Sequence, residues 1–110
     1  MSKDNPGQEG RFKLAVKKRD VVCQVCFKAD NLEVHHIVTR NNKFLKYDMN
    51  NGILLCADHH VYSPVFSAHR TVRLFLDWFE NRYPERWEYL QRHKNKVFHK
   101  ELEVQKVNKK

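Results

Sequence analysis

Four residues in two short pairs constrain this chain more than any other feature. Cys23 and Cys26 are separated by two residues, and Cys56 and His59 repeat that spacing after 29 intervening residues. Two such pairs supply the four thiolate and imidazole ligands of a tetrahedral Zn²⁺. A lone Cys-x2-Cys could equally be two small core residues, but the second pair favours zinc. Because four protein ligands leave no open position, we expect a structural zinc ion that holds the ends of the intervening segment together.

The length and the cysteine count agree with a small domain that uses a metal as a crosslink. A chain of 110 residues suffices for one domain, and a domain this small gains from such a crosslink. Three cysteines cannot all pair in disulfides, residues 1–10 are polar throughout, and no apolar run reaches the ~20 residues of a membrane span. We therefore expect a cytoplasmic protein without a signal peptide or membrane association, whose cysteines bind metal.

The net charge of +8 favours an acidic partner, most commonly nucleic acid. A basic, soluble surface without such a partner is the alternative. The positive charges gather within residues 11–19, residues 40–46 and residues 92–110, the last with seven Lys and Arg against two Glu. The candidate nucleic-acid-binding residues are Arg11, Lys17, Lys18, Arg19, Arg40, Lys43 and Lys46, and Lys13 lies in the same run as the first four.

The distribution of apolar residues predicts an α+β fold. Residues 11–19 are compatible with a short basic helix, and residues 32–38 are rich in β-branched residues, which indicates a strand. A polar loop follows, and residues 52–56 form a second short apolar run, the expected returning strand. A short helix should come next, and Pro64 limits its length.

The C-terminal third predicts two helices. Pro84 fits the first turn of the second helix, which should continue to about residue 95 with Trp87 and Leu90 inward. The first helix has one continuous apolar face made by Val72, Phe75, Leu76, Phe79 and Tyr83.

These elements predict one domain with short extensions. We expect a disordered N-terminus over residues 1–10 and a single domain over residues 11–102. Its ββα core should cover about residues 32–62 and its C-terminal helices about residues 70–100, with a basic tail over residues 103–110.

Two pairs of adjacent histidines lie within the predicted ββα unit. If residues 57–62 are helical, the side chains of His59 and His60 diverge by about 100°, so they cannot face the same ion. His35 and His36 form the other pair. An isolated histidine is most often a hydrogen-bonded surface or core residue, but three candidates in one short unit favour a site. Imidazole can bind a divalent metal or act as a base near neutral pH, and phosphodiester hydrolysis uses both functions.

The segments "CQVC", "LEVHHI" and "NGILLCADHH" resemble the HNH endonuclease family, the ββα-metal nucleases. The resemblance covers about Arg19 to His60. It implies that His35 and His60 bind the catalytic metal and that His36 is the general base. It also implies that Asn51 holds the loop and the base in place, and in some members this residue approaches the metal. The segment after His60 is similar to small stand-alone HNH proteins of phages, for which the location would be the host cytoplasm.

Two positions depart from the family pattern. His59 stands where the family usually has the fourth zinc cysteine, and Cys₃His sites accommodate zinc. His35 stands where the first catalytic ligand is often aspartate. A site with fewer carboxylates is softer, so we expect Mg²⁺ or Mn²⁺ as the catalytic ion, with Co²⁺ and Ni²⁺ able to compete.

Two points of geometry are open at the level of sequence. His35 and His36 would point to opposite faces of an ideal strand, so both reach one cleft only if the strand ends or bulges there. His69 lies nine residues beyond His60. It could contact the catalytic metal or a phosphate, or cap the following helix, and we expect an auxiliary role.

The sequence therefore predicts a metal-dependent endonuclease that hydrolyses DNA phosphodiester bonds, nicking with little sequence specificity. The alternatives are a non-catalytic zinc-stabilised module that binds nucleic acid, and a zinc domain that binds proteins. The expected partner is DNA, and the expected assembly is a monomer or weak dimer. Whether it acts alone or beside a larger DNA-processing or packaging machine is left open.

Overall fold

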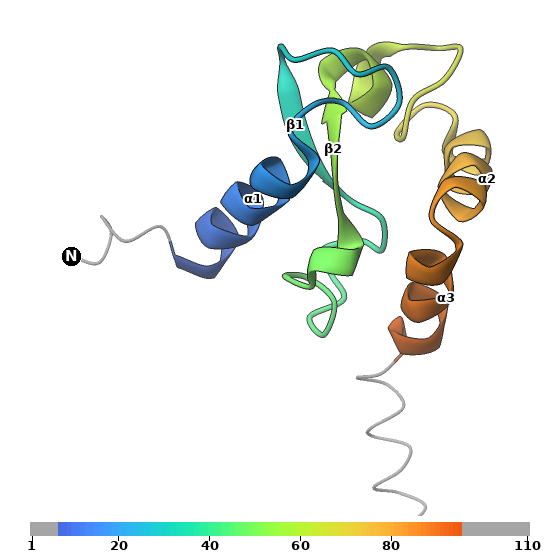
Figure 1. Cartoon of the computed structure of the whole chain (residues 1–110). Helices are drawn as coiled ribbons and strands as arrows, with labels where there is room; N and C mark the ends of the chain where they lie inside the picture. Colours follow the sequence, from blue (N-terminus) through green and yellow to red (C-terminus); the bar gives the residue numbers. More distant parts are fainter. Residues whose placement is uncertain (1–6, 96–110) are drawn as a thin grey trace, which may run out of the picture.

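A computed structural model describes residues 7–95 as a two-stranded hairpin between one N-terminal and two C-terminal helices (Figure 1). The predicted α+β class is confirmed. In chain order the elements are α1 (Gly7–Asp20), β1 (Leu32–His36), a 3₁₀ turn (Met49–Asn51), β2 (Gly52–Cys56), a π-helical turn (Asp58–Tyr62), α2 (Val72–Arg82) and α3 (Pro84–His93).

The hairpin is the central layer of the fold. β1 and β2 are antiparallel, with Leu32 opposite Cys56 and His36 opposite Gly52. Every residue of β2 is buried, because helices cover both faces of the hairpin. Alternate residues of a strand point to opposite faces. Leu54 accordingly packs with α1, whereas Ile53 and Leu55 pack with the aromatic core of α2 and α3.

Gly52 allows α1 to lie directly against the hairpin. A Cβ at this position would lie 2.6 Å from Cζ of Phe12 and 2.8 Å from Cγ2 of Val16. Both of these α1 side chains are buried. The glycine is thus required for space, and it brings α1 to the part of the hairpin opposite His36.

Two element boundaries differ from the sequence prediction. The first helix begins at Gly7, so residues 7–10, which were expected to be disordered, are helical. Glu9 stabilises this first turn through the helix dipole and a 3.2 Å ion pair with Lys13 one turn later. Strand β1 ends at His36, two residues early, because the Val38 N–H donates to the Asn51 side chain.

The remaining helical predictions agree with the structure, except that Val72, expected on the apolar face of α2, is exposed. The element after β2 is a single π-helical turn, closed by the Ser63 N–H donating to Asp58 O, and it ends before Pro64. Pro84 begins α3, and Phe75, Phe79 and Leu90 are buried. Within residues 7–95, no helix is long and apolar enough to cross a membrane. The expectations for residues 1–6 and 96–110, the basic tail included, fall outside the described residues.

Candidate metal centres and active site

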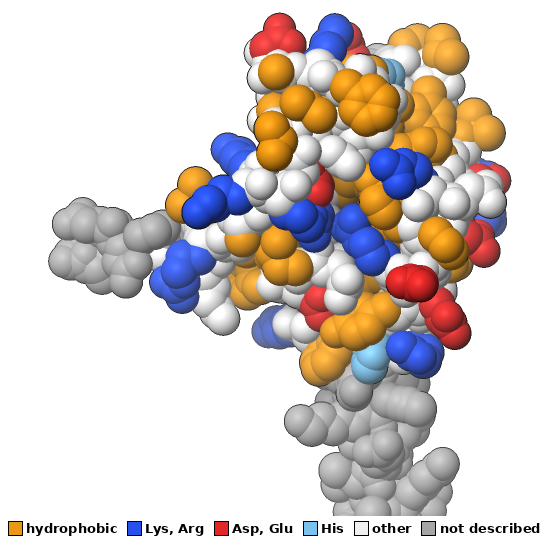
Figure 2. Space-filling model, viewed as in Figure 1, with side chains coloured by type: hydrophobic (Ala, Val, Ile, Leu, Met, Phe, Trp, Pro, Cys, Tyr) orange, Lys and Arg blue, Asp and Glu red, His pale blue; other side chains and the backbone are white. Residues whose placement is uncertain are grey.

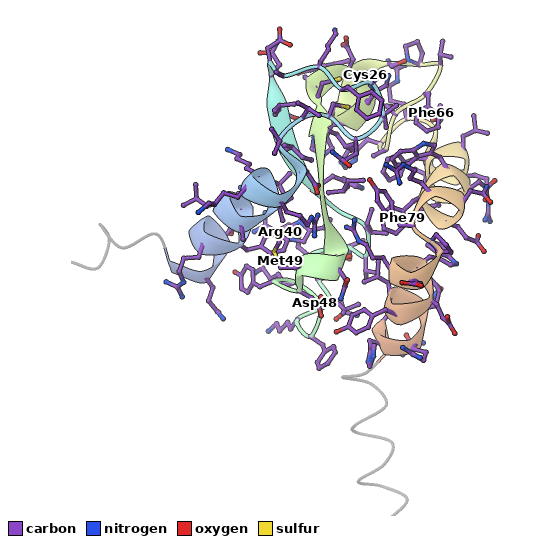
Figure 3. All side chains as sticks on the ribbon, viewed as in Figure 1. Cys26, Arg40, Asp48, Met49, Phe66 and Phe79 are labelled. Atoms are coloured by element: carbon purple, nitrogen blue, oxygen red, sulfur yellow. The ribbon has the colours of Figure 1, made fainter. Side chains whose placement is uncertain are left out.

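The predicted zinc ligands converge at one end of the hairpin. The donor atoms of Cys23, Cys26, Cys56 and His59 all lie within 4.8 Å of one another. The sulfurs of Cys26 and Cys56 are 3.8 Å apart, and His59 Nδ1 lies 3.4 Å from Cys56 Sγ. Ligands held ~2.3 Å from a tetrahedral ion are spaced by ~3.8 Å, so this cluster fits zinc. Cys26 marks this end of the hairpin in Figure 3.

The turn around Cys23 favours its ionised form, which is the form that binds metal. Burial opposes the thiolate, but N–H groups of Cys26, Cys56 and Val25, together with the His59 ring, lower the pKa of Cys23 to about 6. The Val25 N–H lies 3.4 Å from the Cys23 sulfur. The backbone is therefore arranged to support negative charge on sulfur.

A second cluster consists of the rings of His35, His60 and His69. Their donor nitrogens lie within 4.8 Å of one another, with His60 Nε2 and His69 Nε2 3.2 Å apart. His69 reaches this place because its N–H donates to His60 O at 3.0 Å, which folds the chain back on the π-helical turn. The sequence left the role of His69 open, and the structure places its ring beside the other two.

The surroundings favour the neutral forms of His35 and His69, which can offer lone pairs. Burial, with smaller contributions from the nearby His60 and His69 rings, lowers the pKa of His35 to about 3. Burial likewise lowers the pKa of His69. His35 also contacts Phe75 of α2 edge to face, at 5.4 Å between ring centroids. Three imidazoles that converge in this way could hold a divalent cation.

Glu33 orients the second ligand and was missed at the level of sequence. Its Oε1 lies 2.5 Å from His60 Nδ1, so the Nδ1–H donates to the carboxylate and the Nε2 lone pair faces the cluster. Carboxylates commonly fix metal-binding histidines in this way. Glu33 and His35 are two residues apart on β1, hence on one face of the strand, and this i, i+2 spacing is a signal that could have found it.

His36 has the geometry of a general base. Its Nε2 lies 2.9 Å from Lys46 O. Because a carbonyl only accepts, Nε2 carries the proton, and Nδ1 of the neutral ring keeps its lone pair. The ring stacks on Phe12 with centroids 5.1 Å apart, and burial lowers its pKa. His36 is therefore neutral at neutral pH.

His35 and His36 border one cleft although they point to opposite faces. The cleft has a volume of about 420 Å³, and the strand ends at His36, beside its mouth. The residues that line it are Lys13, Val34, His35, His36, Ile37, Thr39, Arg40, His60, Ala68, His69, Val72, Phe75 and Leu76.

Asn51 lies behind the cleft and does not line it. It is fully buried, and its Oδ1 accepts from the Val38 N–H at 2.6 Å. Its Nδ2 donates to Val38 O at 2.9 Å and to Leu45 O at 3.1 Å. The side chain thus closes the loop that carries the Lys46 carbonyl, on which His36 depends.

The predicted basic residues lie in different surroundings. Figure 2 shows Lys and Arg side chains over α1 and across the centre of the visible face. Arg40 lines the cleft of about 420 Å³ that His35 and His36 border, and Lys43 and Lys46 line a separate cavity of about 470 Å³. Arg11, Lys17 and Lys18 are exposed on α1.

Arg19 differs, because its guanidinium is bound within the protein. It donates to Met49 O at 2.7 Å and to Gly52 O at 2.6 Å, and it also pairs with Asp20. Arg86 of α3, not singled out in the sequence, donates to the same Gly52 O at 2.6 Å. Burial lowers the pKa of Arg86 to about 10, so it stays charged at neutral pH. Two arginines therefore hold the backbone opposite His36.

Comparison with known proteins agrees with the geometry. The family model described as HNH endonuclease matches residues 23–61. A search of curated proteins and a search of solved structures gave no match. The matched segment runs from the first zinc cysteine through the turn that holds both His59 and His60. Residues 23–61 of this chain are therefore similar to HNH endonucleases.

Proposed function

We propose that the protein is a metal-dependent endonuclease that hydrolyses DNA phosphodiester bonds. The observation that carries the proposal is one cleft that contains both a three-histidine cluster and a neutral histidine with a lone pair on Nδ1. A purely binding module has no need of either group. The family match supports nuclease chemistry in general, and the finer assignments below are proposals.

His35, His60 and His69 would hold the catalytic ion. When bound, a divalent cation supplies positive charge to a phosphate oxygen and to the leaving 3′ oxygen. The three imidazoles form a softer donor set than carboxylates. We therefore propose that Mn²⁺, Co²⁺ or Ni²⁺ supports activity at least as well as Mg²⁺. The Cys23, Cys26, Cys56 and His59 cluster would hold a structural zinc ion.

His36 would accept the proton of the attacking water at Nδ1. The oxygen of that water forms a bond to phosphorus while the bond from phosphorus to the 3′ oxygen breaks, and the leaving 3′ oxygen takes a proton from solvent water. The products carry 5′-phosphate and 3′-hydroxyl ends. The Nε2–H remains bonded to Lys46 O, which holds the ring in place and stabilises the imidazolium that forms. Asn51 contributes indirectly, by closing the loop that presents this carbonyl.

Exposed cations would supply affinity without reading sequence. Arg11, Lys17 and Lys18 offer contacts from α1, and Arg40, Lys43 and Lys46 offer them from the loop after β1. Contacts of this kind to phosphates give salt-sensitive, largely sequence-independent binding. One active site cuts one strand, so a monomer would produce nicks. Arg19 would contribute indirectly, by holding the backbone at Met49 and Gly52.

A plasmid-nicking assay tests the proposal. Supercoiled plasmid is incubated with the protein and Mg²⁺, Mn²⁺, Co²⁺ or Ni²⁺ at constant ionic strength. We expect nicked circles, and a rate lower by roughly 10²–10⁴ for His36→Ala. Zinc content and DNA affinity of that variant should match wild type. Retardation of the plasmid without nicking under any metal would favour the non-catalytic binding module instead.

A further inference from the structure

A cluster of three charged residues lies at the edge of the catalytic cleft. The Glu9 carboxylate lies 3.2 Å from Lys13 Nζ through one oxygen and 2.9 Å from Arg40 Nη2 through the other. Glu9 and Lys13 are one turn apart on α1, and Arg40 comes from the loop after β1 and lies against α1 (Figure 3). Lys13 and Arg40 both line the cleft that holds His36, whereas Glu9 does not.

The two cations are arranged as a receptor for an anion with two oxygens. A carboxylate and a phosphodiester both present such a pair, and the planar guanidinium binds either one. The Glu9 carboxylate thus takes the position, between Lys13 and Arg40, that a backbone phosphate could take. It is supplied by the protein itself, at the mouth of a cleft suited to phosphodiester chemistry.

The exposure of the cluster makes exchange feasible. The side chains of Lys13, Arg40 and Glu9 are 45%, 53% and 35% exposed. Ion pairs this exposed add little stability, because water and salt screen them. Losing the Glu9 contacts therefore costs little, provided that another anion replaces the carboxylate.

The cluster also lies in the same cleft as the candidate base, because Lys13, Arg40 and His36 all line it. An anion between Lys13 and Arg40 would therefore lie near the reacting group, within the reach of a DNA strand that passes through the cleft.

We propose that Lys13 and Arg40 form a subsite for the DNA phosphate adjacent to the scissile one, and that Glu9 occupies this subsite until the phosphate displaces it. The proposal rests on the proposed function, because it takes DNA as the ligand of the same cleft. In this proposal Glu9 competes with the substrate, so removing the Glu9 carboxylate should tighten DNA binding.

A charge-matched pair of variants tests the competition. Glu9→Gln and Glu88→Gln each remove one negative charge, and Glu88 is exposed on α3. Binding of a labelled DNA duplex is measured by fluorescence anisotropy without divalent ions, so that cleavage does not contribute. We expect Glu9→Gln to bind at least threefold more tightly than Glu88→Gln at low salt, with the difference shrinking as salt rises.

A double-mutant cycle shows whether Arg40 is the site of competition. Arg40→Gln should weaken binding more strongly in the Glu9→Gln background than in wild type, because the carboxylate no longer masks the guanidinium. In the Glu88→Gln background its effect should equal that in wild type. Equal effects in all three backgrounds would overturn the proposal.

The remaining outcomes are also informative. If Glu9 merely fastens α1 to the loop, Glu9→Gln will lower the melting temperature and weaken DNA binding, which contradicts the subsite. Absence of DNA binding by every variant contradicts it as well. Tighter binding by Glu9→Gln without nicking under any metal would support the subsite while rejecting the nuclease assignment. If the protein nicks DNA but Glu9→Gln and Glu88→Gln bind the duplex with the same affinity, the nuclease assignment stands and the subsite is rejected.

Discussion

His59 and His60 are neighbours in the chain, yet their rings lie in different clusters. His59 Nδ1 lies 3.4 Å from the Cys56 sulfur, whereas His60 Nε2 lies 3.2 Å from His69. The divergence predicted from helical geometry is observed, although the turn is π-helical rather than α-helical. At the residue scale, one step along the chain separates a candidate structural ligand from a candidate catalytic one.

Replacing His59 and replacing His60 should therefore have different effects on the protein. His59→Ala removes one of four zinc ligands, so zinc content and melting temperature should both fall, and activity with them. His60→Ala should keep zinc and melting temperature near wild type, while the divalent-ion concentration for half-maximal nicking rises at least tenfold. Metal analysis, thermal melts and nicking rates in one buffer compare the variants. Equal zinc loss in both would reject the division.

The acid side of the pH–rate profile tests His36. Burial lowers its pKa below the ordinary imidazole value of about 6.5, so the neutral base persists to lower pH than it would in water. At saturating metal, nicking should decline on the acid side with a midpoint below pH 6.5. His35 and His69, whose pKa values are also lowered, should still bind metal in this range. A decline with its midpoint above 6.5 would contradict the assignment.

At the scale of elements, the loop between the strands is ordered by one buried side chain. Asn51 bonds to Val38 on both its N–H and C=O and to the Leu45 carbonyl. Leu45 itself is fully buried. The loop therefore behaves as a fixed element, which it must do in order to hold Lys46 O against His36.

Replacing Asn51 should loosen this loop and the base together. Asn51→Ala removes the side-chain partner of both the N–H and the C=O of Val38, and it leaves Leu45 O with the Asp48 N–H alone. The loss should cost about 3 kcal/mol of unfolding free energy. The exposed Asn81, bonded only within α2, provides the control, since Asn81→Ala should cost less than about 1 kcal/mol. Denaturant titration measures both. A near-native Asn51→Ala with full nicking rate would show that the loop does not position the base.

Sequence patterns predicted the hairpin, the zinc ligands and the helical divergence because each depends on local spacing. The two cysteine and histidine pairs and the β-branched residues within residues 32–38 are signals of that kind. His69, Arg86 and Glu9 were not assigned because their positions depend on tertiary contacts. Only the fold-back of the chain after Pro64 brings His69 to His60, and only the packing of α3 brings Arg86 to Gly52.

At the scale of the whole molecule, the cleft is assembled from segments beyond the family match. Lys13 comes from α1, His69 from the loop before α2, and Phe75 from α2 itself. The aromatic core of α2 and α3 packs against β2, and the zinc cluster adjoins the same core through Cys23 and Cys56. Folding, zinc binding and cleft formation should therefore be coupled.

Loss of zinc should accordingly unfold the protein rather than merely inactivate it. Structural zinc contributes on the order of 10 kcal/mol or more, which exceeds the usual margin of stability of a small domain. Cys56→Ser should lose zinc and its cooperative thermal transition, while Asn81→Ala, at an exposed position of α2, should keep both. A Cys56→Ser protein that melts like wild type without zinc would refute the coupling.

The single turn that carries both His59 and His60 has a thermodynamic consequence. An ion held by His59 restricts the backbone of the π-helical turn, so a second ion at His60 meets a ligand that is already ordered. Occupancy of the two sites should then be positively cooperative. Because such coupling is reciprocal, the ion at His60 should tighten zinc binding by the same free energy with which zinc tightens the binding of that ion. Equilibrium dialysis of each ion, with and without the other, would measure both halves of that cycle.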